Sequence, residues 1–295
     1  MKTKKTIILC MFTFATIGLS LDACKKDNSS TSTTSPSAGV DASVSATASE
    51  TMYDDAFGIV AQGSDQTGIS SSSIAGTPVV DGLSTSSGTF ATSGGATITL
   101  LPADPSVFPK TMTIDFGAGI KSADSVTRKG QIIVTLSGKL RVAGSVITVT
   151  FNNYSVNGYA LTGTYSLTPK IASNSGINYS ITVVNGSITF PNGSVSNYSG
   201  TEIFTQTGGM STPSVADDTY AITGNFSYSS TATGSISGTI TTALVKSADC
   251  KDITSGIIAF NYKGLNGTLD FGSGACDNLA TITFGKTVKV ITLAK

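Results

Sequence analysis

The strongest constraint on the fold is a run of short, strand-like segments that continues from Ala96 to the end of the chain. In residues 146–151, for example, Ile147, Val149 and Phe151 alternate with polar residues and share one face. No long helical pattern separates these segments, which disfavours a parallel βαβ architecture. The sequence therefore predicts an all-β fold, an antiparallel β-sandwich or meander, with one short N-terminal helix.

Residues 49–62 carry the helix, because Met52, Phe57 and Val60 fall at helical spacing there. Four Asn-Gly pairs favour two-residue type I′ hairpin turns: Asn157-Gly158, Asn185-Gly186, Asn192-Gly193 and Asn266-Gly267. The predicted strands are residues 96–101, 111–116, 131–136, 145–151, 160–167, 179–184, 187–190, 220–228, 235–241, 256–262, 267–271, 280–284 and 288–293.

The N-terminus has the pattern of a secretion signal. Three lysines in the first five residues precede an apolar stretch at residues 6–21, which is short for a membrane-spanning helix. The stretch ends at Leu21-Asp22-Ala23-Cys24 and resembles the lipobox of bacterial lipoproteins, although Asp22 departs from the small neutral residue usual there. The resemblance implies cleavage before Cys24 and lipidation of that cysteine; ordinary cleavage after Ala23 is the alternative.

Four regions follow from these patterns. Residues 1–23 are the signal peptide, and residues 24–48, rich in Ser and Thr, are expected to form a flexible tether. Residues 49–95 hold the short helix and a Gly/Ser-rich loop, and residues 96–295 form the β-rich domain. Residues 112–119 and 267–274 match each other around Asp-Phe-Gly-x-Gly, so this domain is interpreted as two related halves, 96–210 and 215–295.

Several segments resemble a group of uncharacterised lipoproteins of the phylum Bacteroidota. They are the Cys-Lys-Lys-Asp start at Cys24, the Arg-Lys-Gly-Gln-Ile-Ile-Val stretch at 128–134, the segment 151–158, and Asp-Phe-Gly-Ser-Gly-Ala-Cys-Asp-Asn at 270–278. The resemblance covers about 200 residues. It implies a lipid-anchored protein of the bacterial outer membrane, periplasmic or surface-exposed, and implies no activity.

Composition excludes several chemistries. The chain contains no histidine, so it has no Ser-His-Asp triad, no Cys-His dyad and no imidazole metal ligand. Net charge is zero and only two arginines are present, Arg128 and Arg141, which argues against nucleic acid as a partner. The sequence predicts no cofactor and no enzymatic activity. Paired-carboxylate hydrolysis is the enzymatic route left open. The only two glutamates are Glu50 and Glu202, of which Glu50 lies near the tether, and nothing singles out a pair of aspartates.

Two cysteines remain once Cys10 and Cys24 are assigned to the signal and the lipid. Cys250 and Cys276 form an even pair in an exported chain, so a disulfide between them is predicted. A metal or catalytic role is disfavoured, because neither has a histidine partner or a second cysteine close in sequence.

Aspartates near glycines could supply oxygen ligands to calcium. The candidates are Asp115, Asp124, Asp270 and Asp277, although aspartate beside glycine is more often a turn residue that bonds its own backbone. Ser125 lies in Asp124-Ser125-Val126, which resembles the acceptor for O-glycans on exported Bacteroidota proteins.

Tyrosines on a sheet face could stack on sugar rings, although tyrosines in strands are more often half-buried. The candidates are Tyr154, Tyr159, Tyr165, Tyr179 and Tyr198. Together these features favour a non-enzymatic surface module that binds an extracellular glycan or serves the envelope as a structural protein. Its expected partners are the membrane, through the lipid, and a glycan or envelope protein. The alternative is a carboxylate-only polysaccharide hydrolase.

Overall fold

The structure is a computed structural model that describes residues 35–70, 89–91, 95–122, 124–172, 176–212, 214, 217–247, 250 and 252–293. These residues form one long helix, α1 (Pro36–Gln66), and a single antiparallel sheet. The strands are β1 (Thr89–Ala91), β2 (Thr97–Leu101), β3 (Lys110–Asp115), β4 (Ile120–Lys121), β5 (Thr127–Leu136), β6 (Ile147–Val156), β7 (Tyr159–Ile171), β8 (Ile177–Thr189), β9 (Val195–Gly208), β10 (Thr219–Ser230), β11 (Gly234–Ser247), β12 (Ser255–Tyr262), β13 (Leu265–Ser273), β14 (Leu279–Phe284) and β15 (Thr287–Thr292).

The sheet is a meander in which each strand pairs with its neighbours in sequence. The order runs from β1 to β15, and β4 lies off this path, paired with β5 alone. The predicted all-β class with one N-terminal helix is confirmed. β9 and β10 are paired along twelve residue positions, so the sheet is continuous across the boundary between the predicted halves 96–210 and 215–295.

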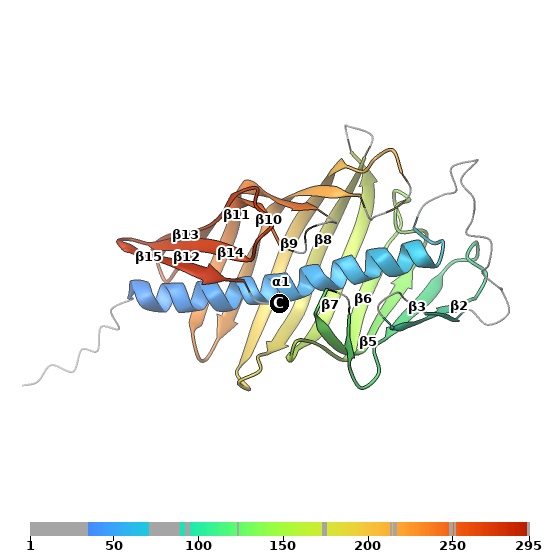
Figure 1. Ribbon diagram of the computed structural model, residues 1–295, viewed down its shortest axis with the longest axis horizontal. Coiled ribbons are helices and arrows are strands. Elements are labelled where there is room, and N and C mark those ends of the chain that lie inside the picture. The colour runs from blue at the N-terminus through green and yellow to red at the C-terminus, as the bar shows by residue number, and fades with distance from the viewer. Residues whose placement is uncertain are drawn as a thin grey trace, which may run out of the picture. The chain divides into compact units, whose positions relative to one another are not determined.

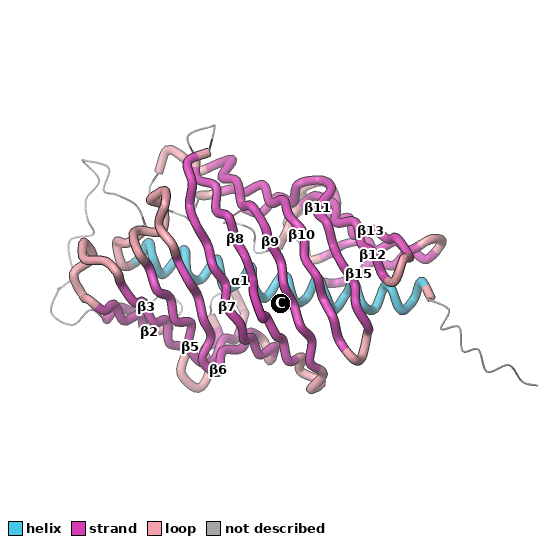
Figure 2. Tube along the Cα trace, turned by 180° about the vertical axis from the view of Figure 1, so that it is seen from behind, coloured by secondary structure: helices cyan, strands magenta, loops and turns pink. Residues whose placement is uncertain are grey.

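Helix α1 lies across one face of the sheet, and the strands curve around it (Figure 1). It lies close to β5 and β7 and to the five strands from β11 to β15. Figure 2 shows the opposite face, which we call the outer face; in the described part of the chain no helix covers it. Inward residues therefore form one core with α1, and outward residues meet solvent.

The helix is longer than predicted, and the expectation of a flexible tether is wrong for residues 36–48. Ser35 caps its first turn by accepting a hydrogen bond from the Ala38 N–H, and Pro36 occupies the first turn. No apolar stripe marks this region, because many of the positions that it buries hold small or polar residues. Ser43 and Ser64 of α1, for example, are buried and donate to carbonyls four residues earlier.

Two of the predicted Asn-Gly hairpin turns are wrong, and both glycines serve the core instead. Gly267 lies inside β13, where the Phe284 ring occupies the space that a side chain would fill; the hairpin turn is Lys263-Gly264, with both φ angles positive. Asn185-Gly186 forms a bulge within β8, because the register against β9 shifts between Val183 and Gly186.

The other two pairs lie in connections between strands. Asn157-Gly158 joins β6 to β7 with both φ angles positive, as a type I′ turn requires. Asn192-Gly193 lies in the loop between β8 and β9, where only the glycine has positive φ.

Both arginines are structural. Arg128 of β5 donates to Asp55 of α1 through Nε and an NH2 group, and also contacts Asp124. Arg141 pairs with the fully buried Asp218, and thereby fixes the segment before β10. Each guanidinium joins segments that are distant in sequence, so neither is available as an anion site. Among the described residues, no helix is both long and apolar enough to span a membrane.

Candidate functional site

The outer face carries a trough across β8 to β12 with a volume of about 720 Å³. Two parallel rows of short polar side chains line it. One row joins Asn197, Ser229 and Ser235 across β9, β10 and β11, and the other consists of Ser199, Ser227, Ser237 and Asn261. Between the rows lie Tyr198, Tyr228 and Ile236, whose side chains point inward and are buried. The floor is therefore backbone, and the walls are hydroxyls and amides.

Lys263 is the one charged residue among those that line the trough. Its Nζ lies 5.3 Å from the centroid of the Tyr262 ring, which holds the ammonium beside the hairpin between β12 and β13. The lining as a whole is close to neutral and rich in groups that both donate and accept hydrogen bonds.

The polar character of the trough extends over the rest of the outer face. A single row of paired residues crosses the sheet from β2 to β15, and none of its members is buried. Most are Thr or Ser: the row is Leu101, Thr111, Thr135, Thr148, Ser166, Thr182, Thr201, Asn225, Thr239, Ala259, Thr268, Thr283 and Val288. Sequence composition indicated many hydroxyls but not that strand register aligns them.

The inner face holds a second candidate, a cluster of buried carboxyls between α1 and the sheet. Glu50 and Asp54, one helical turn apart on α1, face Glu202 of β9. Their exposed fractions are 6%, 7% and 6%. Glu50 and Glu202 interact through their carboxyls, so the only two glutamates of the chain meet in the core.

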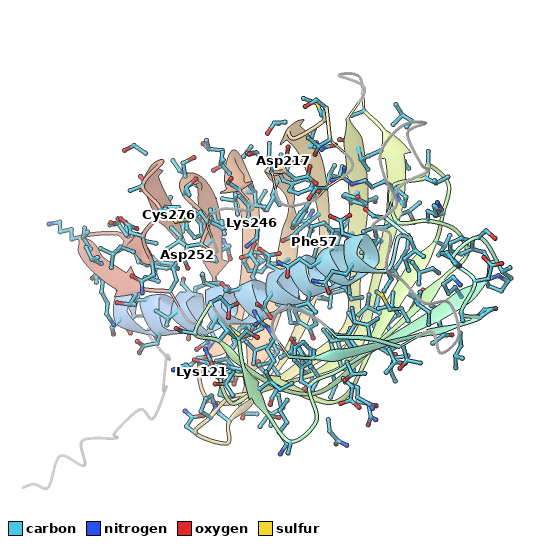
Figure 3. All side chains as sticks on the ribbon, turned by 45° about the vertical axis from the view of Figure 1, so that its right-hand side comes forward. Phe57, Lys121, Asp217, Lys246, Asp252 and Cys276 are labelled. Atoms are coloured by element: carbon cyan, nitrogen blue, oxygen red, sulfur yellow. A yellow bond between two sulfur atoms is a disulfide. The ribbon has the colours of Figure 1, made fainter. Side chains whose placement is uncertain are left out.

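Burial dominates the electrostatics of this cluster. Desolvation, together with the charge of Asp54, raises the pKa of Glu202 to about 8, although the hydrogen bond with Glu50 opposes the rise. The pKa of Asp54 is raised to about 6, again mainly by burial, while Lys246 of β11 opposes the shift. Lys246 lies beside α1 in Figure 3. For Glu50 the pKa is raised well above its ordinary value by burial and by the neighbouring carboxyls.

Each of the four calcium candidates forms a local hydrogen bond of the kind that aspartate makes in a turn. Each accepts a hydrogen bond from the backbone N–H two residues later, at distances between 2.7 and 3.0 Å. The pairs are Asp115 with Gly117, Asp124 with Val126, Asp270 with Gly272, and Asp277 with Leu279. In the described residues, no three His, Cys, Asp or Glu side chains are grouped so as to hold a metal ion. The turn interpretation is confirmed, and the repeated Asp-Phe-Gly motif is one local structure used twice.

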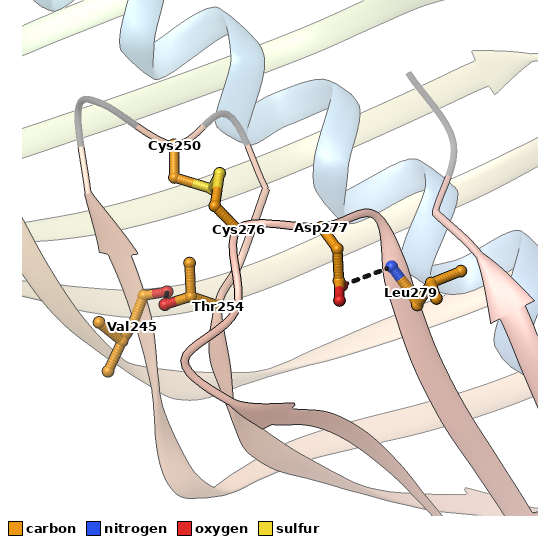
Figure 4. The surroundings of a disulfide bond; sticks show 6 residues. All are labelled: Val245, Cys250, Thr254, Cys276, Asp277 and Leu279. Atoms are coloured by element: carbon orange, nitrogen blue, oxygen red, sulfur yellow. Dashed lines mark hydrogen bonds between the residues drawn. A yellow bond between two sulfur atoms is a disulfide. The ribbon is translucent and has the colours of Figure 1, made fainter.

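The predicted disulfide is present between Cys250 and Cys276, whose Cα atoms are 5.8 Å apart (Figure 4). It links the β11–β12 loop to the β13–β14 loop. Nearby, Thr254 donates its backbone N–H to Val245, and Asp277 receives the Leu279 N–H. The bond thus closes the C-terminal end of the sheet and has a structural role.

The tyrosines considered as candidates for a sugar-stacking face are packed strand residues, which was the favoured interpretation of them. Tyr154, Tyr165, Tyr179 and Tyr198 are between 0% and 3% exposed, and Tyr159 is half-buried. Tyr198 stacks on Tyr53 of α1 with ring centroids 5.2 Å apart. The aromatic stacking interpretation is therefore wrong for the four buried rings, since α1 covers the face that they occupy.

The two modification candidates have different outcomes. Ser125 is exposed in the turn between β4 and β5, with a φ of 65°, so an acceptor at this residue is accessible. Whether it carries a glycan stays a prediction. Cys24 lies outside the described residues, and lipidation also stays a prediction.

No family model matches this chain, and neither does any curated protein or solved structure with which it was compared.

Proposed function

We propose that this chain is a lipid-anchored protein of the bacterial outer membrane that binds a neutral glycan along its outer face and catalyses no reaction. The observation that carries the proposal is the trough across β8 to β12. Its walls offer serine hydroxyls and asparagine amides from five adjacent strands, at positions fixed by strand register.

The chemistry of the lining favours a ligand rich in hydroxyl groups. Serine hydroxyls and asparagine amides donate and accept hydrogen bonds, as sugar hydroxyls do. They also bind without the large desolvation cost of charged groups. Lys263 is the one charged residue of the lining, and a single positive charge is too few to balance a polyanion, so a neutral glycan fits the trough better.

The length of the trough favours a chain over a single sugar. Adjacent strands lie about 4.8 Å apart, so the four intervals from β8 to β12 span about 19 Å. The wall residues belong to a continuous sheet, which holds them in place before the ligand binds and lowers the entropy cost of binding.

A polysaccharide hydrolase is the second candidate, because Glu50 and Glu202 lie together. In a glycosidase, the two catalytic carboxyls flank the glycosidic bond that is cleaved, so the substrate must be able to reach both of them. Here α1 covers both carboxyls, and each residue is 6% exposed. The observation therefore supports binding at the outer face more strongly than hydrolysis at the inner one.

The location rests on the sequence signal that ends at Cys24. If lipid is attached there, residues 24–34 connect the anchor to α1, and eleven residues extend at most about 40 Å. Two or more acyl chains give stable anchoring, at about 0.8 kcal/mol per buried CH₂. The anchor would then hold the protein at the membrane surface.

A glycan array with matched variants tests the proposal. Ser227→Tyr and Ser237→Tyr fill the trough from β10 and β11, whereas Thr113→Tyr places the same ring on the outer face of β3, outside the trough. We expect the unmodified chain and Thr113→Tyr to bind the same neutral glycans, and both trough variants to lose at least tenfold in affinity. No binding to any glycan, or binding that the trough variants leave unchanged, would refute the proposal.

A further inference from the structure

The three buried carboxyls described above lie where α1 crosses the sheet, and their surroundings supply little compensating charge. Glu50 and Asp54 come from α1 and Glu202 from β9. Lys246 of β11 is the cation that acts on Asp54. The next carboxylate along the helix, Asp55, is already bound by Arg128. If all three carboxyls were ionised, the buried and largely unpaired charges would raise the free energy of the folded state.

Buried tyrosines lie beside the carboxyls. Tyr165 of β7 and Tyr198 of β9 are close enough to interact with them, and Tyr53 of α1 stacks on Tyr198; each ring is at most 3% exposed. The Tyr53 hydroxyl is engaged, because it donates to the Thr162 carbonyl at 2.8 Å. The Tyr165 hydroxyl has no hydrogen-bond partner among the described residues. The walls of the cluster are thus neutral rings that cannot balance an anion.

Within the described part of the chain, each glutamate of the cluster also has one carboxyl oxygen without a hydrogen-bond partner. Glu50 Oε2 and Glu202 Oε1 are buried without a partner among the described residues, while the carboxyls interact with each other. Two carboxyls in contact can form a hydrogen bond only if one of them carries a proton. Burial favours the protonated state and raises the pKa of both groups. The charges of Glu202 and Asp54 raise the pKa of Glu50 further, and the charge of Asp54 adds to the rise at Glu202, which its hydrogen bond with Glu50 partly opposes.

We propose that Glu50 and Glu202 form a buried proton-binding site that fixes α1 to the sheet, and that loss of this proton releases the middle of the helix. The shared proton joins α1 directly to β9, a central strand of the meander. Without it, two adjacent anions face each other across the interface and repel. α1 then separates from β9 while β-sheet pairing persists.

The contribution of this site to stability should fall as the pH rises. A carboxyl whose pKa is higher in the folded state than in the unfolded state binds its proton more tightly when folded. Its stabilising effect is complete below about pH 4, the unfolded pKa range, and is lost progressively as pH rises towards the folded pKa. For Glu202 the folded pKa is about 8, so the effect is lost between about pH 5 and pH 8.

Thermal unfolding from pH 6 to pH 9 tests the site, using Glu50→Gln and Glu202→Gln. Each glutamine is isosteric and uncharged, so neither variant should repel its partner at high pH. We expect the Tm of the unmodified chain to fall by about 5 °C or more over this range. Both variants should show a flatter profile, and Asp270→Asn, at an exposed turn, should behave like the unmodified chain. An unchanged slope in both glutamine variants would overturn the proposal.

Hydrogen exchange locates the change and does not depend on how the variants fold. After correction for the intrinsic pH dependence of exchange, α1 amides around Glu50 should exchange at least tenfold faster at pH 8.5 than at pH 6.5. Amides of β8 to β10 should change much less. Equal protection of α1 at both pH values, or equal loss of protection in helix and sheet, would contradict release of the helix.

Discussion

The aromatic ring of Phe226 in β10 lies over Gly238 of the neighbouring strand β11, so that a Cβ atom at residue 238 would sit 2.3 Å from the ring. The arrangement repeats across the sheet. The inward row Gly200, Phe226, Gly238, Phe260, Gly267 and Phe284 alternates glycine with phenylalanine on successive strands. Large rings fit beneath α1 because each has a neighbour without a side chain.

Gly238→Ala should therefore destabilise the protein. The added methyl group meets a buried ring, and overpacking of this kind costs about 1–3 kcal/mol. Gly58→Ala is the matched control, since a Cβ there meets nothing within 4 Å and alanine favours helix by up to about 1 kcal/mol. In urea unfolding, the midpoint of Gly238→Ala should lie at a lower urea concentration than that of the parent chain, and the midpoint of Gly58→Ala at a higher one. A Gly238→Ala midpoint equal to or above the parent would contradict the packing argument.

Arg128→Met should remove the ionic link between β5 and α1. Asp55 and Asp124 would lose their guanidinium partner, and breaking a buried pair costs about 3 kcal/mol or more. Lys129→Met on the exposed side of the same strand should change stability by less than about 0.5 kcal/mol. Both are measured by urea unfolding at pH 6.5. Equal stability of the two variants would show that Arg128 does not fix the helix.

The Cys250–Cys276 bond should stabilise the sheet mainly by restricting the unfolded chain. A separation of 26 residues corresponds to about 3.5 kcal/mol in the chain-entropy model. A non-reducing peptide map of the exported protein should show the two cysteine peptides linked. The double variant Cys250→Ser, Cys276→Ser should unfold at lower urea concentration. Free alkylation of both thiols in the folded protein would exclude the bond.

Cleavage and lipidation at Cys24 are tested separately. Mass spectrometry of the mature protein from a bacterial membrane should find Cys24 as the first residue, carrying acyl chains. Cys24→Ala should release the protein from the membrane fraction without changing its unfolding midpoint, because Cys24 precedes the folded unit. An unmodified Cys24 at the mature N-terminus would refute the anchor.

The sequence was sufficient for the all-β class, because apolar alternation marks most strands, and for the disulfide, because only two cysteines remained to pair. It was insufficient for β9, which no apolar alternation marks. The inward positions of β9 include Ser196, Glu202 and Gln206, all buried. These polar residues hid the strand, and one of them belongs to the carboxyl cluster. Polar residues at buried positions break the apolar alternation that marks a strand. The sequence pattern therefore indicated neither β9 nor the carboxyl cluster that contains Glu202.

The start of α1 was hidden by its environment. Residues 36–48 lack an apolar stripe, because the positions that α1 buries here hold small or polar side chains such as Ala42 and Ser43. Gly39 illustrates this, because a Cβ there would lie 3.0 Å from the Phe284 ring. Helical periodicity is recognised by an apolar stripe opposite a polar face. It does not identify a helix whose buried face is itself made of small and polar residues.

The central claim is that the protein binds a glycan without cleaving it. It is tested most directly by measuring binding and hydrolysis in the same sample. The protein is incubated at pH 6.5 with a neutral polysaccharide chosen from the array, and bound protein and newly formed reducing ends are measured together. We predict saturable binding, no release of reducing ends, and loss of binding in Ser227→Tyr but not in Glu202→Gln. Release of reducing ends by the parent chain, abolished by Glu202→Gln, would contradict the account and assign the carboxyl pair to hydrolysis.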